Sequence, residues 1–370
     1  MNPRYKKIYT CTPVAFHAND GFFIRDTGLI SDGIRRMGIE SKCIMPLPYH
    51  EDDQKEHLIR TSMSNLKSVQ WWKDLGIDGL ILYSWGMPKY NSIARAIHKA
   101  GIRLVIHMDT SGNFDKLLPE QYTPSKAFVK WCTSTVKNFF RAKHLKYADA
   151  ITMARPVAEV ISKKRFFNKS IVKKNVPMPC PLSADCFYDG RNKKDIILAV
   201  GRWDDKVKRA DFLMKALDLF YQHSQKIETR IYGTLTNELI NWHKLLPPDT
   251  KKRIKLNGYI SNNFLRDEYK KAKVIVCTSR SESSHIVSAE GLCCGCSVVV
   301  SNRPDPLRTV SWYTTKNSGT ISEEDTPESL AKALIHELGE WEKGNRDPQA
   351  IAEAWSPHFH INKVLPHLFP

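Results

Sequence analysis

The feature that most constrains the fold is an alternation of short apolar runs with amphipathic stretches along the 370-residue chain. Such alternation is typical of parallel strands connected by helices. It stops in the loop-rich residues 175–189 and then begins again. The pattern predicts an α/β protein with two doubly wound domains, over residues 1–180 and 190–350. A C-terminal segment, 351–370, is expected to cross back to the first domain.

The expected elements fall into two series. In the first, we expect strands at residues 7–14, 42–45, 79–83, 103–107 and 150–153, and helices at 22–37, 65–75, 91–100 and 125–147. In the second, we expect strands at 195–200, 228–232, 254–257, 274–277 and 297–300, and helices at 210–223, 237–245, 263–271, 286–293 and 327–340. Ligands of such sheets bind at the carboxyl ends of the strands, so the loops there carry the candidate functional residues.

The charge is unevenly divided between the halves. Residues 1–184 contain 29 basic and 15 acidic residues, a net charge of +14, whereas residues 185–370 contain 27 and 24, a net charge of +3. A basic half indicates an anionic partner: nucleic acid, a membrane surface or a phosphorylated ligand. Nucleic acid is disfavoured, because no zinc finger, RRM signature or basic heptad region accompanies the charge.

The nine cysteines are scattered and lie mostly in apolar runs, as expected for reduced core thiols of a cytosolic protein. The cluster Cys293-Cys294-Gly295-Cys296 lacks the second ligand couple of a usual zinc site, so we expect no metal. No apolar run approaches the roughly 18 residues of a membrane-spanning helix. No apolar region follows the basic start either, so a secretory signal is not expected.

The most informative segment spans residues 279–300, between two expected strands. Its polar loop precedes a helix that should begin near His285 or Ile286 and end at Gly295, because glycine suits a left-handed helix cap. The free N–H groups of a helix N-terminus bind anions. We therefore expect a phosphate near Ser284, His285 and Ile286.

Two glutamates flank this helix start. Glu282 precedes it and Glu290 lies about one turn inside it. One carboxylate can accept hydrogen bonds from hydroxyls ahead of the phosphate, and the other from hydroxyls behind it. The sequence leaves an alternative open, in which Glu282 caps the helix and Glu290 is a solvated surface residue.

A second segment, residues 197–213, runs from a strand through a glycine turn into a basic loop and a helix. Arg202 and Lys208 follow the carboxyl end of that strand, where two cations could neutralise a diphosphate without a metal ion. The alternative is a solvated basic loop, because Lys206 and Arg209 stand beside them.

Together these segments resemble the retaining GT-B glycosyltransferases of family 4, the glycosyltransferases group 1, and in particular those of bacterial surface polysaccharides. The residues that match the family pattern are Gly201, Arg202, Lys208, Gly233, Glu282, Glu290 and Gly295. The resemblance covers essentially the whole chain and implies two Rossmann-like domains that face each other across a cleft. It implies that Arg202 and Lys208 bind the diphosphate of a nucleotide sugar, Glu290 the ribose, and Glu282 the hydroxyls of the donor sugar.

The first domain resembles the family more loosely. Gly21 is available at a turn where the family often carries a glycine-rich loop near the donor phosphates. His107 and Asp109 lie at the carboxyl end of an expected strand, where the family commonly places a polar residue, often His, against the donor sugar. These two residues and Glu282 are the expected catalytic residues. The alternative for His107 is a hydrogen-bonded histidine with a structural role.

The resemblance implies a hexosyltransferase-type enzyme that transfers a sugar, with retention, to a hydroxyl of a glycan or lipid-linked acceptor in lipopolysaccharide or capsule synthesis. No metal or other cofactor is expected. One alternative is a weak or inactive GT-B binding protein, which the joint presence of Arg202, Lys208, Glu282 and Glu290 disfavours. Another is a dinucleotide-dependent oxidoreductase, disfavoured because no G-x-G-x-x-G follows either first strand.

The stretch between Glu120 and Asp149 contains no acidic residue. Its basic residues Lys126, Lys130, Lys137, Arg141, Lys143 and Lys146 alternate with Phe128, Trp131, Phe139, Phe140 and Tyr147. Such a pattern suits an interfacial helix on an anionic membrane. Together with the lipid-linked acceptors that the resemblance implies, it leads us to expect a peripheral protein on the inner face of the cell membrane. The alternative is that these aromatic residues form the core of the domain.

Overall fold

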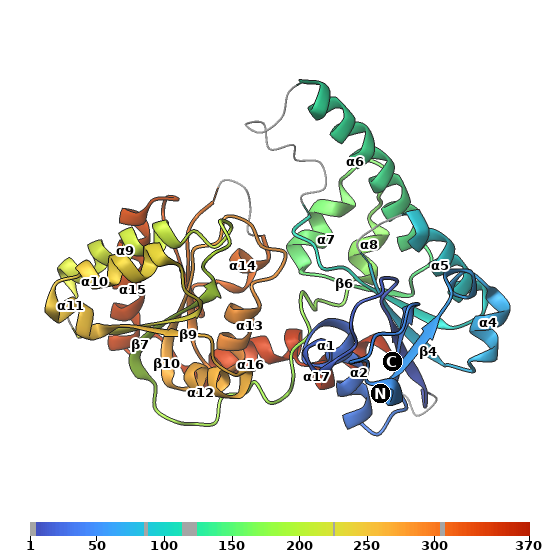
Figure 1. Ribbon diagram of the computed structural model, residues 1–370, viewed down its shortest axis with the longest axis horizontal. Coiled ribbons are helices and arrows are strands. Elements are labelled where there is room, and N and C mark those ends of the chain that lie inside the picture. The colour runs from blue at the N-terminus through green and yellow to red at the C-terminus, as the bar shows by residue number, and fades with distance from the viewer. Residues whose placement is uncertain (1–4, 85–87, 113–123, 225, 304–307) are drawn as a thin grey trace. The chain divides into compact units, whose positions relative to one another are not determined.

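The computed structural model describes residues 5–84, 88–112, 124–224, 226–303 and 308–370 (Figure 1). The chain forms two compact units. Unit 1 comprises Met1–Ala184 and His358–Pro370, and unit 2 comprises Asp185–Pro357. The first division therefore falls within the loop-rich residues 175–189. None of the helices in the described ranges is both long and apolar enough to span a membrane.

Unit 1 contains a parallel six-stranded sheet in the order β3-β2-β1-β4-β5-β6. Its strands are β1 (Ile8–Cys11), β2 (Cys43–Pro46), β3 (Leu58–Thr61), β4 (Gly79–Tyr83), β5 (Arg103–His107) and β6 (Ala150–Thr152). Its helices are α1 (Asp20–Phe23), α2 (Asp26–Arg36), η1 (Lys55–His57), α3 (Met63–Leu66), α4 (Val69–Asp74), α5 (Pro88–Lys99), α6 (Pro124–Leu145), α7 (Arg155–Ser162), α8 (Ser170–Lys174) and α17 (Ile361–Leu368). Helix α2 packs on β1 and β2 and contacts α17. Helix α5 lies between α4 and α6 and contacts both (Figure 1).

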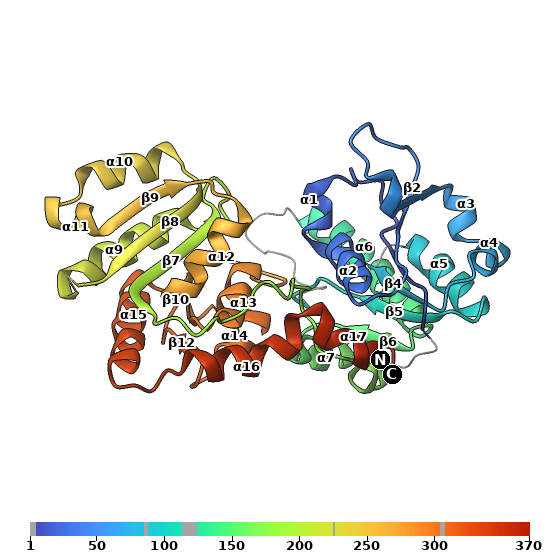
Figure 2. The same cartoon turned by 90° about the horizontal axis from the view of Figure 1, so that it is seen from below.

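Unit 2 repeats this architecture with a parallel sheet in the order β12-β11-β10-β7-β8-β9. Its strands are β7 (Lys194–Arg202), β8 (Glu228–Thr234), β9 (Ile254–Gly258), β10 (Ala272–Cys277), β11 (Ser297–Val300) and β12 (Gly319–Ile321). Its helices are α9 (Ala210–His223), α10 (Asn237–Leu245), α11 (Pro248–Arg253), α12 (Asn262–Lys271), α13 (Ile286–Cys293), α14 (Arg308–Tyr313) and α15 (Pro327–Glu342), and α16 (Pro348–Phe359) crosses the division between the units. Helices α9 and α15 pack against each other, as do α12 and α13 on the other face of the sheet (Figure 2).

Both sheets have the strand order of a dinucleotide-binding fold, in which the first and fourth strands of each unit are neighbours. The expected fold class is therefore confirmed. Two edge strands, β3 and β12, were not expected. They are only four and three residues long, too short for a hydrophobic period to distinguish them from loops.

The C-terminal helix α17 completes the core of unit 1. The side chains of Ile361, Leu365 and Phe369 are buried in one cluster with strand residues of β1, β4 and β5. This packing requires glycine at two positions, because a Cβ at Gly33 would overlap Ile361 and one at Gly79 would overlap Phe369. Residues at the two ends of the chain thus build one core.

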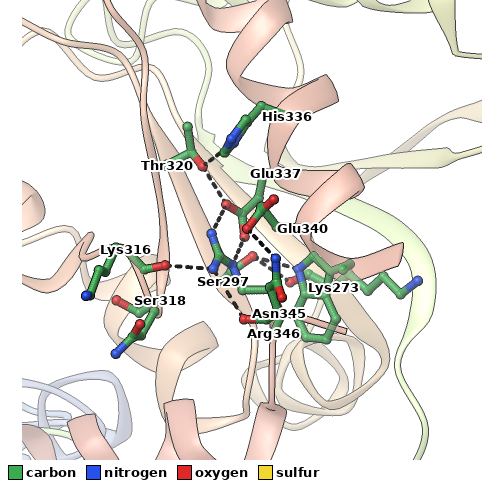
Figure 3. Close-up of polar contacts among 12 residues, drawn as sticks. Lys273, Ser297, Lys316, Ser318, Thr320, His336, Glu337, Glu340, Asn345 and Arg346 are labelled. Atoms are coloured by element: carbon green, nitrogen blue, oxygen red, sulfur yellow. Dashed lines mark hydrogen bonds and ion pairs between the residues drawn. The ribbon is translucent and has the colours of Figure 1, made fainter. Parts of the chain in front are cut away.

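A buried ion pair lies beside β12, an edge strand of the sheet in unit 2. Arg346 donates two hydrogen bonds to Glu337 of α15, at 2.6 and 2.7 Å, and both side chains are almost fully buried. Thr320 of β12 also donates to Glu337, at 2.6 Å, and Arg346 donates to the carbonyl oxygen of Lys316 (Figure 3). The pair therefore joins β12, α15 and the residues that lead into α16.

Candidate functional site

In unit 2, the penultimate residues of β7 and β8 are paired glycines, Gly201 and Gly233. Gly233 has φ +110°, and a Cβ there would overlap the carbonyl oxygen of Gly201. Only glycine fits position 233. A Cβ on Gly201 would make only ordinary contacts with Lys208 and Trp203. The two strand ends therefore approach each other closely and leave backbone exposed beside Lys208.

The side chains of Lys208 and Glu282 form an ion pair at this edge of the sheet. The Lys208 Nζ donates to Glu282 Oε1 at 2.5 Å, and the two side chains are only 19% and 14% exposed. Burial raises the pKa of Glu282, but its electrostatic interactions with His285 and with the Lys208 ammonium lower it, and the net shift is downward. Glu282 is thus a carboxylate held by a cation, and it does not cap the helix.

The loop after β10 is fixed to the loop after β7. The Thr278 hydroxyl donates to the carbonyl oxygen of Lys208 at 2.6 Å, and the Arg280 N–H donates to that of Val207 at 2.7 Å. These bonds hold Lys208 and Glu282 together without relying on their charges alone.

Helix α13 begins at Ile286, with His285 as the N-cap, where the sequence predicted its start. His285 is buried, its Nδ1 lies 2.6 Å from the Ser288 hydroxyl, and burial lowers its pKa to about 4, so it is neutral at pH 7. The Ser284 hydroxyl is buried and has no hydrogen-bond partner among the described residues. With the N–H groups of the first turn, it forms a donor set suited to an anion.

Glu290 lies one turn into α13 and is half-buried. Burial raises its pKa to about 7, against smaller lowering effects of the Tyr269 hydroxyl and Arg266. It is therefore not a solvated surface carboxylate. A carboxyl group with this pKa changes charge near neutral pH.

Arg202 has a more open environment than Lys208. It is the last residue of β7, its side chain is 75% exposed, and it pairs with Asp205 at 3.0 Å. Asp205 also accepts a hydrogen bond from the Val207 N–H at 2.9 Å. Arg202 is thus held at the surface of the loop that carries Lys208.

The carboxyl ends of three strands in unit 1 bring Tyr83, His107 and Thr152 side by side. His107 is buried, and its Nδ1 lies 2.6 Å from the Thr152 hydroxyl. Burial lowers the pKa of His107 to about 4, so its ring is neutral at pH 7. It can therefore act as a neutral hydrogen-bonding group rather than as a cation.

Asp109 lies two residues beyond β5 and accepts a hydrogen bond from the Tyr83 hydroxyl at 3.1 Å. Asp26, the first residue of α2, lies near it. The pKa of Asp26 is raised by its burial and by the negative charge of Asp109, against a lowering effect of Arg25. The structure thus adds Asp26 and Tyr83 to the expected pair of His107 and Asp109.

The expectation for Gly21 was wrong in its local structure. Gly21 lies inside the short helix α1, which Asn19 caps, and not at a turn. A Cβ at Gly21 would meet only the Asn19 Oδ1, at 3.3 Å, so nothing in the backbone requires glycine there.

Sequence reasoning missed Tyr83, Thr152 and Asp26 because their proximity to the site depends on strand order and register. The position of Tyr83 at the end of an apolar run was the available signal. It also missed Tyr269 and Arg266, which lie in an unremarkable amphipathic helix. For metal ligands, no group of three or more His, Cys, Asp or Glu side chains suited to an ion occurs in the described part of the chain.

Comparison with known families gives one match. Residues 194–339 match the model of the family described as glycosyl transferases group 1. The matched range contains Gly201, Arg202, Lys208, Glu282 and Glu290. No curated protein matches the chain significantly.

Solved structures match over nearly the whole chain. HepE of Anabaena, in complex with UDP, is 12% identical with a TM-score of 0.64, and 98% of each chain is covered. A glycosyltransferase of Rickettsia africae is 14% identical with a TM-score of 0.64, covering 98% of this chain and 97% of that one. The lipopolysaccharide outer core galactosyltransferase WaaB is 14% identical with a TM-score of 0.61, covering 98% and 99%. At these identities the likeness shows the fold.

Proposed function

We propose that the chain, a glycosyltransferase with a glycosyl transferases group 1 domain on the GT-B fold, transfers a sugar from a nucleoside diphosphate to an acceptor hydroxyl with retention of configuration. The observation that carries this proposal is the ion pair of Lys208 and Glu282 beside the N-terminus of α13. The solved structure of HepE holds UDP. The same class of ligand fits the donors of unit 2.

The donor diphosphate would lie against the first turn of α13, with Lys208 and the Ser284 hydroxyl as further donors. As the glycosidic bond breaks, negative charge develops on the leaving diphosphate, and these groups stabilise it. Arg202 is exposed and can turn from Asp205 towards the same charge. Because these cations and the N-terminus of α13 would offset the negative charge of the diphosphate, we propose that the reaction needs no metal ion.

The two glutamates would each bind a different uncharged part of the donor. Glu290 is placed to accept hydrogen bonds from the ribose hydroxyls. Glu282, held by Lys208, would orient the hydroxyls of the donor sugar. In unit 1, His107 and Asp109 would contact the reacting sugar as neutral and charged hydrogen-bonding groups.

For the acceptor, we propose a glycan or lipid-linked glycan of surface-polysaccharide synthesis, used at the inner face of the membrane. The support is the net charge of +14 on residues 1–184, derived from 29 basic and 15 acidic residues. It is also consistent with the likeness to WaaB, a lipopolysaccharide outer core galactosyltransferase.

The test is a binding and turnover screen on the full chain. Calorimetry with UDP, GDP, ADP, NAD and an oligonucleotide should give one nucleoside diphosphate a Kd below about 1 mM, with the corresponding nucleotide sugars slowly hydrolysed in EDTA. Glu290→Gln should weaken nucleotide binding. The matched control Glu238→Gln, at an exposed position of α10, should not.

Binding of NAD or the oligonucleotide without any nucleoside diphosphate would overturn the proposal. Loss of turnover in EDTA with recovery in Mg²⁺ would overturn its metal independence. Proton NMR of the first product formed from an identified donor and acceptor would report the anomeric configuration, and an inverted product would overturn retention.

A further inference from the structure

Helix α6 presents aromatic rings to solvent. Phe128, Trp131 and Phe139 are 64%, 52% and 41% exposed, and their spacing places them along one side of the helix. The rings of Phe128 and Trp131 stack with centroids 6.1 Å apart. The N-terminal half of α6 extends beyond α7 and α8 (Figure 1). These residues therefore do not form the core of unit 1, which was the alternative interpretation of the sequence.

The aromatic side of α6 continues onto the loop between α7 and α8. Phe166 of that loop is 42% exposed, and its ring meets Phe139 edge to face at 5.6 Å. Phe166 has φ +74°, which is strained for a bulky residue. Phe166 thus combines a left-handed backbone with an aromatic side chain that is partly exposed and packs on Phe139.

Cations surround these rings. The ammonium of Lys143 lies 5.4 Å from the ring centre of Phe139, and the guanidinium of Arg165 lies 5.0 Å from that of Phe166. In residues 124–174 the acidic residues are Asp149 and Glu159. Glu159 pairs with Arg155 at 3.3 Å. The side chains of Lys126 and Lys130 lie outside the described residues.

A cavity of about 170 Å³ lies between α6 and the loop. Trp131 and Phe166 form apolar parts of its lining, and Ser134, Thr135, Lys164 and Arg165 supply hydroxyls and positive charge. Hydroxyls and cations in a small hollow suit a phosphate group. The rings beside it suit the boundary between lipid headgroups and acyl chains.

We propose that this surface, formed by Phe128, Trp131, Phe139, Phe166 and the cavity between them, docks on a bilayer of anionic phospholipid. The aromatic rings enter the headgroup region, and the cavity takes a lipid phosphate. The charge selects this partner, because cations near an anionic surface are attracted to it and several are grouped here. The inference deepens the proposed function, whose acceptor is used at a membrane face, by naming the surface that docks there; docking itself needs neither donor nor turnover.

The test is co-sedimentation of the full chain with vesicles. Binding is expected to vesicles of phosphatidylcholine with 30% phosphatidylglycerol, at least about tenfold tighter than to phosphatidylcholine alone, and to weaken as salt screens the charges. Phe128→Ser with Trp131→Ser, and separately Lys164→Glu with Arg165→Glu, should each lower binding about tenfold or more.

Matched control variants come from unit 2. Leu245→Ser removes an 85% exposed apolar side chain, and Lys251→Glu with Lys252→Glu reverses two exposed charges on α11. Both should bind vesicles as the unmodified chain does. Circular dichroism and hydrolysis of a nucleotide sugar would show that every variant is folded.

Three results would overturn the proposal. The first is equally weak binding to neutral and anionic vesicles at low salt. The second is unchanged vesicle binding in folded Phe128→Ser/Trp131→Ser and Lys164→Glu/Arg165→Glu variants. The third is a concentration-dependent dimer that protects these rings and does not bind vesicles, because the occupant would then be a second copy. Loss of vesicle binding with retained hydrolysis would leave the glycosyl transfer intact.

Discussion

The two units share a strand order, but each has a buried arginine–carboxylate pair at a different end of its strands: the carboxyl ends in unit 1 and the amino ends in unit 2. In unit 1, Arg60 and Asp53 are completely buried, and Arg60 donates to the carbonyl oxygens of Pro46 and Phe16. Pro46 is the last residue of β2, and Phe16 lies in the loop after β1. In unit 2, Arg346 and Glu337 lie near the amino ends of β11 and β12, where Trp341 donates to Ser297 at 2.9 Å.

In unit 2 the buried ion pair therefore lies away from the end of the sheet where ligands bind. In unit 1 the buried ion pair lies at that end. Ligands bind at the carboxyl ends of parallel strands. In unit 2 that edge carries the partly exposed pair of Lys208 and Glu282, which a ligand can rearrange. In unit 1 the same edge is braced by a buried pair, so its loops after β1 and β2 hold a fixed shape.

The largest expected effect is on the stability of unit 2. Arg346→Met leaves Glu337 buried without its partner and should lower the free energy of unfolding by about 3–5 kcal/mol. Chemical denaturation would measure the loss. The double variant with Glu337→Met should recover most of it, and nucleotide affinity of the folded protein should not change.

The corresponding change in unit 1, Arg60→Met, should cost a similar amount and also perturb the loops after β1 and β2. If Arg346→Met altered nucleotide affinity in fully folded protein as strongly as it altered stability, the separation between the two edges of unit 2 would be wrong.

The next effect is on catalysis. Lys208→Met removes the cation beside Glu282 and a donor to the diphosphate, and should lower kcat/KM about 100-fold or more. Arg202→Met should lower it less, because that side chain is exposed and paired with Asp205. Lys206→Met, at an exposed position of the same loop, is the matched control. Equal losses in all three variants would show that only the net charge of the loop matters.

A third effect is the acid stability of the two units. His107 and His144 in unit 1 and His285 in unit 2 are buried, and burial lowers the pKa of each to about 4. Between pH 6.5 and 4 the unfolded chain therefore binds more protons at these sites, and stability falls as the pH falls. Glu290, with a pKa of about 7, has the opposite effect in unit 2 between pH 4.5 and 7.

Unit 1 should therefore lose more stability than unit 2 between pH 6.5 and 4.5. Hydrogen exchange of peptides from each unit would measure this, and His144→Gln should reduce the difference. Burial raises the pKa of Asp26 above its normal value of 3.8. This shift opposes the loss of stability caused by the histidines of unit 1, but it starts from a normal pKa well below that of histidine. Equal loss of protection in both units would contradict the assignment.

The smallest expected effect is the pH dependence of nucleotide affinity. If the Glu290 carboxylate accepts hydrogen bonds from the ribose, affinity should rise several-fold between pH 6 and 8 as Glu290 loses its proton. The neutral Glu290→Gln variant should lack that component. Parallel pH profiles of the two proteins, measured by calorimetry, would show that Glu290 does not contact the nucleotide through its carboxylate.

Local features of the fold were accessible from the sequence. The start of α13 at Ile286 and the left-handed Gly295 at its end depend only on nearby residues, and both were predicted. Glu282 and Lys208 were each singled out, but their ion pair joins residues 74 positions apart. It depends on β10 lying next to β7, and hydrophobic periodicity carries no information about strand order.

The row of Tyr83, His107 and Thr152 was missed for the same reason. Exposure was a second limit: amphipathic periodicity in α6 is equally compatible with aromatic rings that face the core or the solvent. Only the packing of α5 and of the loop after α7 decides which side of α6 is covered.

The return of the C-terminal segment to unit 1 has a consequence for biosynthesis. A ribosome makes residues 1–184 first, yet the core of unit 1 needs Ile361, Leu365 and Phe369, which are made after all of unit 2. Unit 2 can complete its core while unit 1 still lacks a helix. The half of the chain that is translated first is therefore expected to finish folding last, and until then the apolar surface around Gly33 and Gly79 stays open to chaperones.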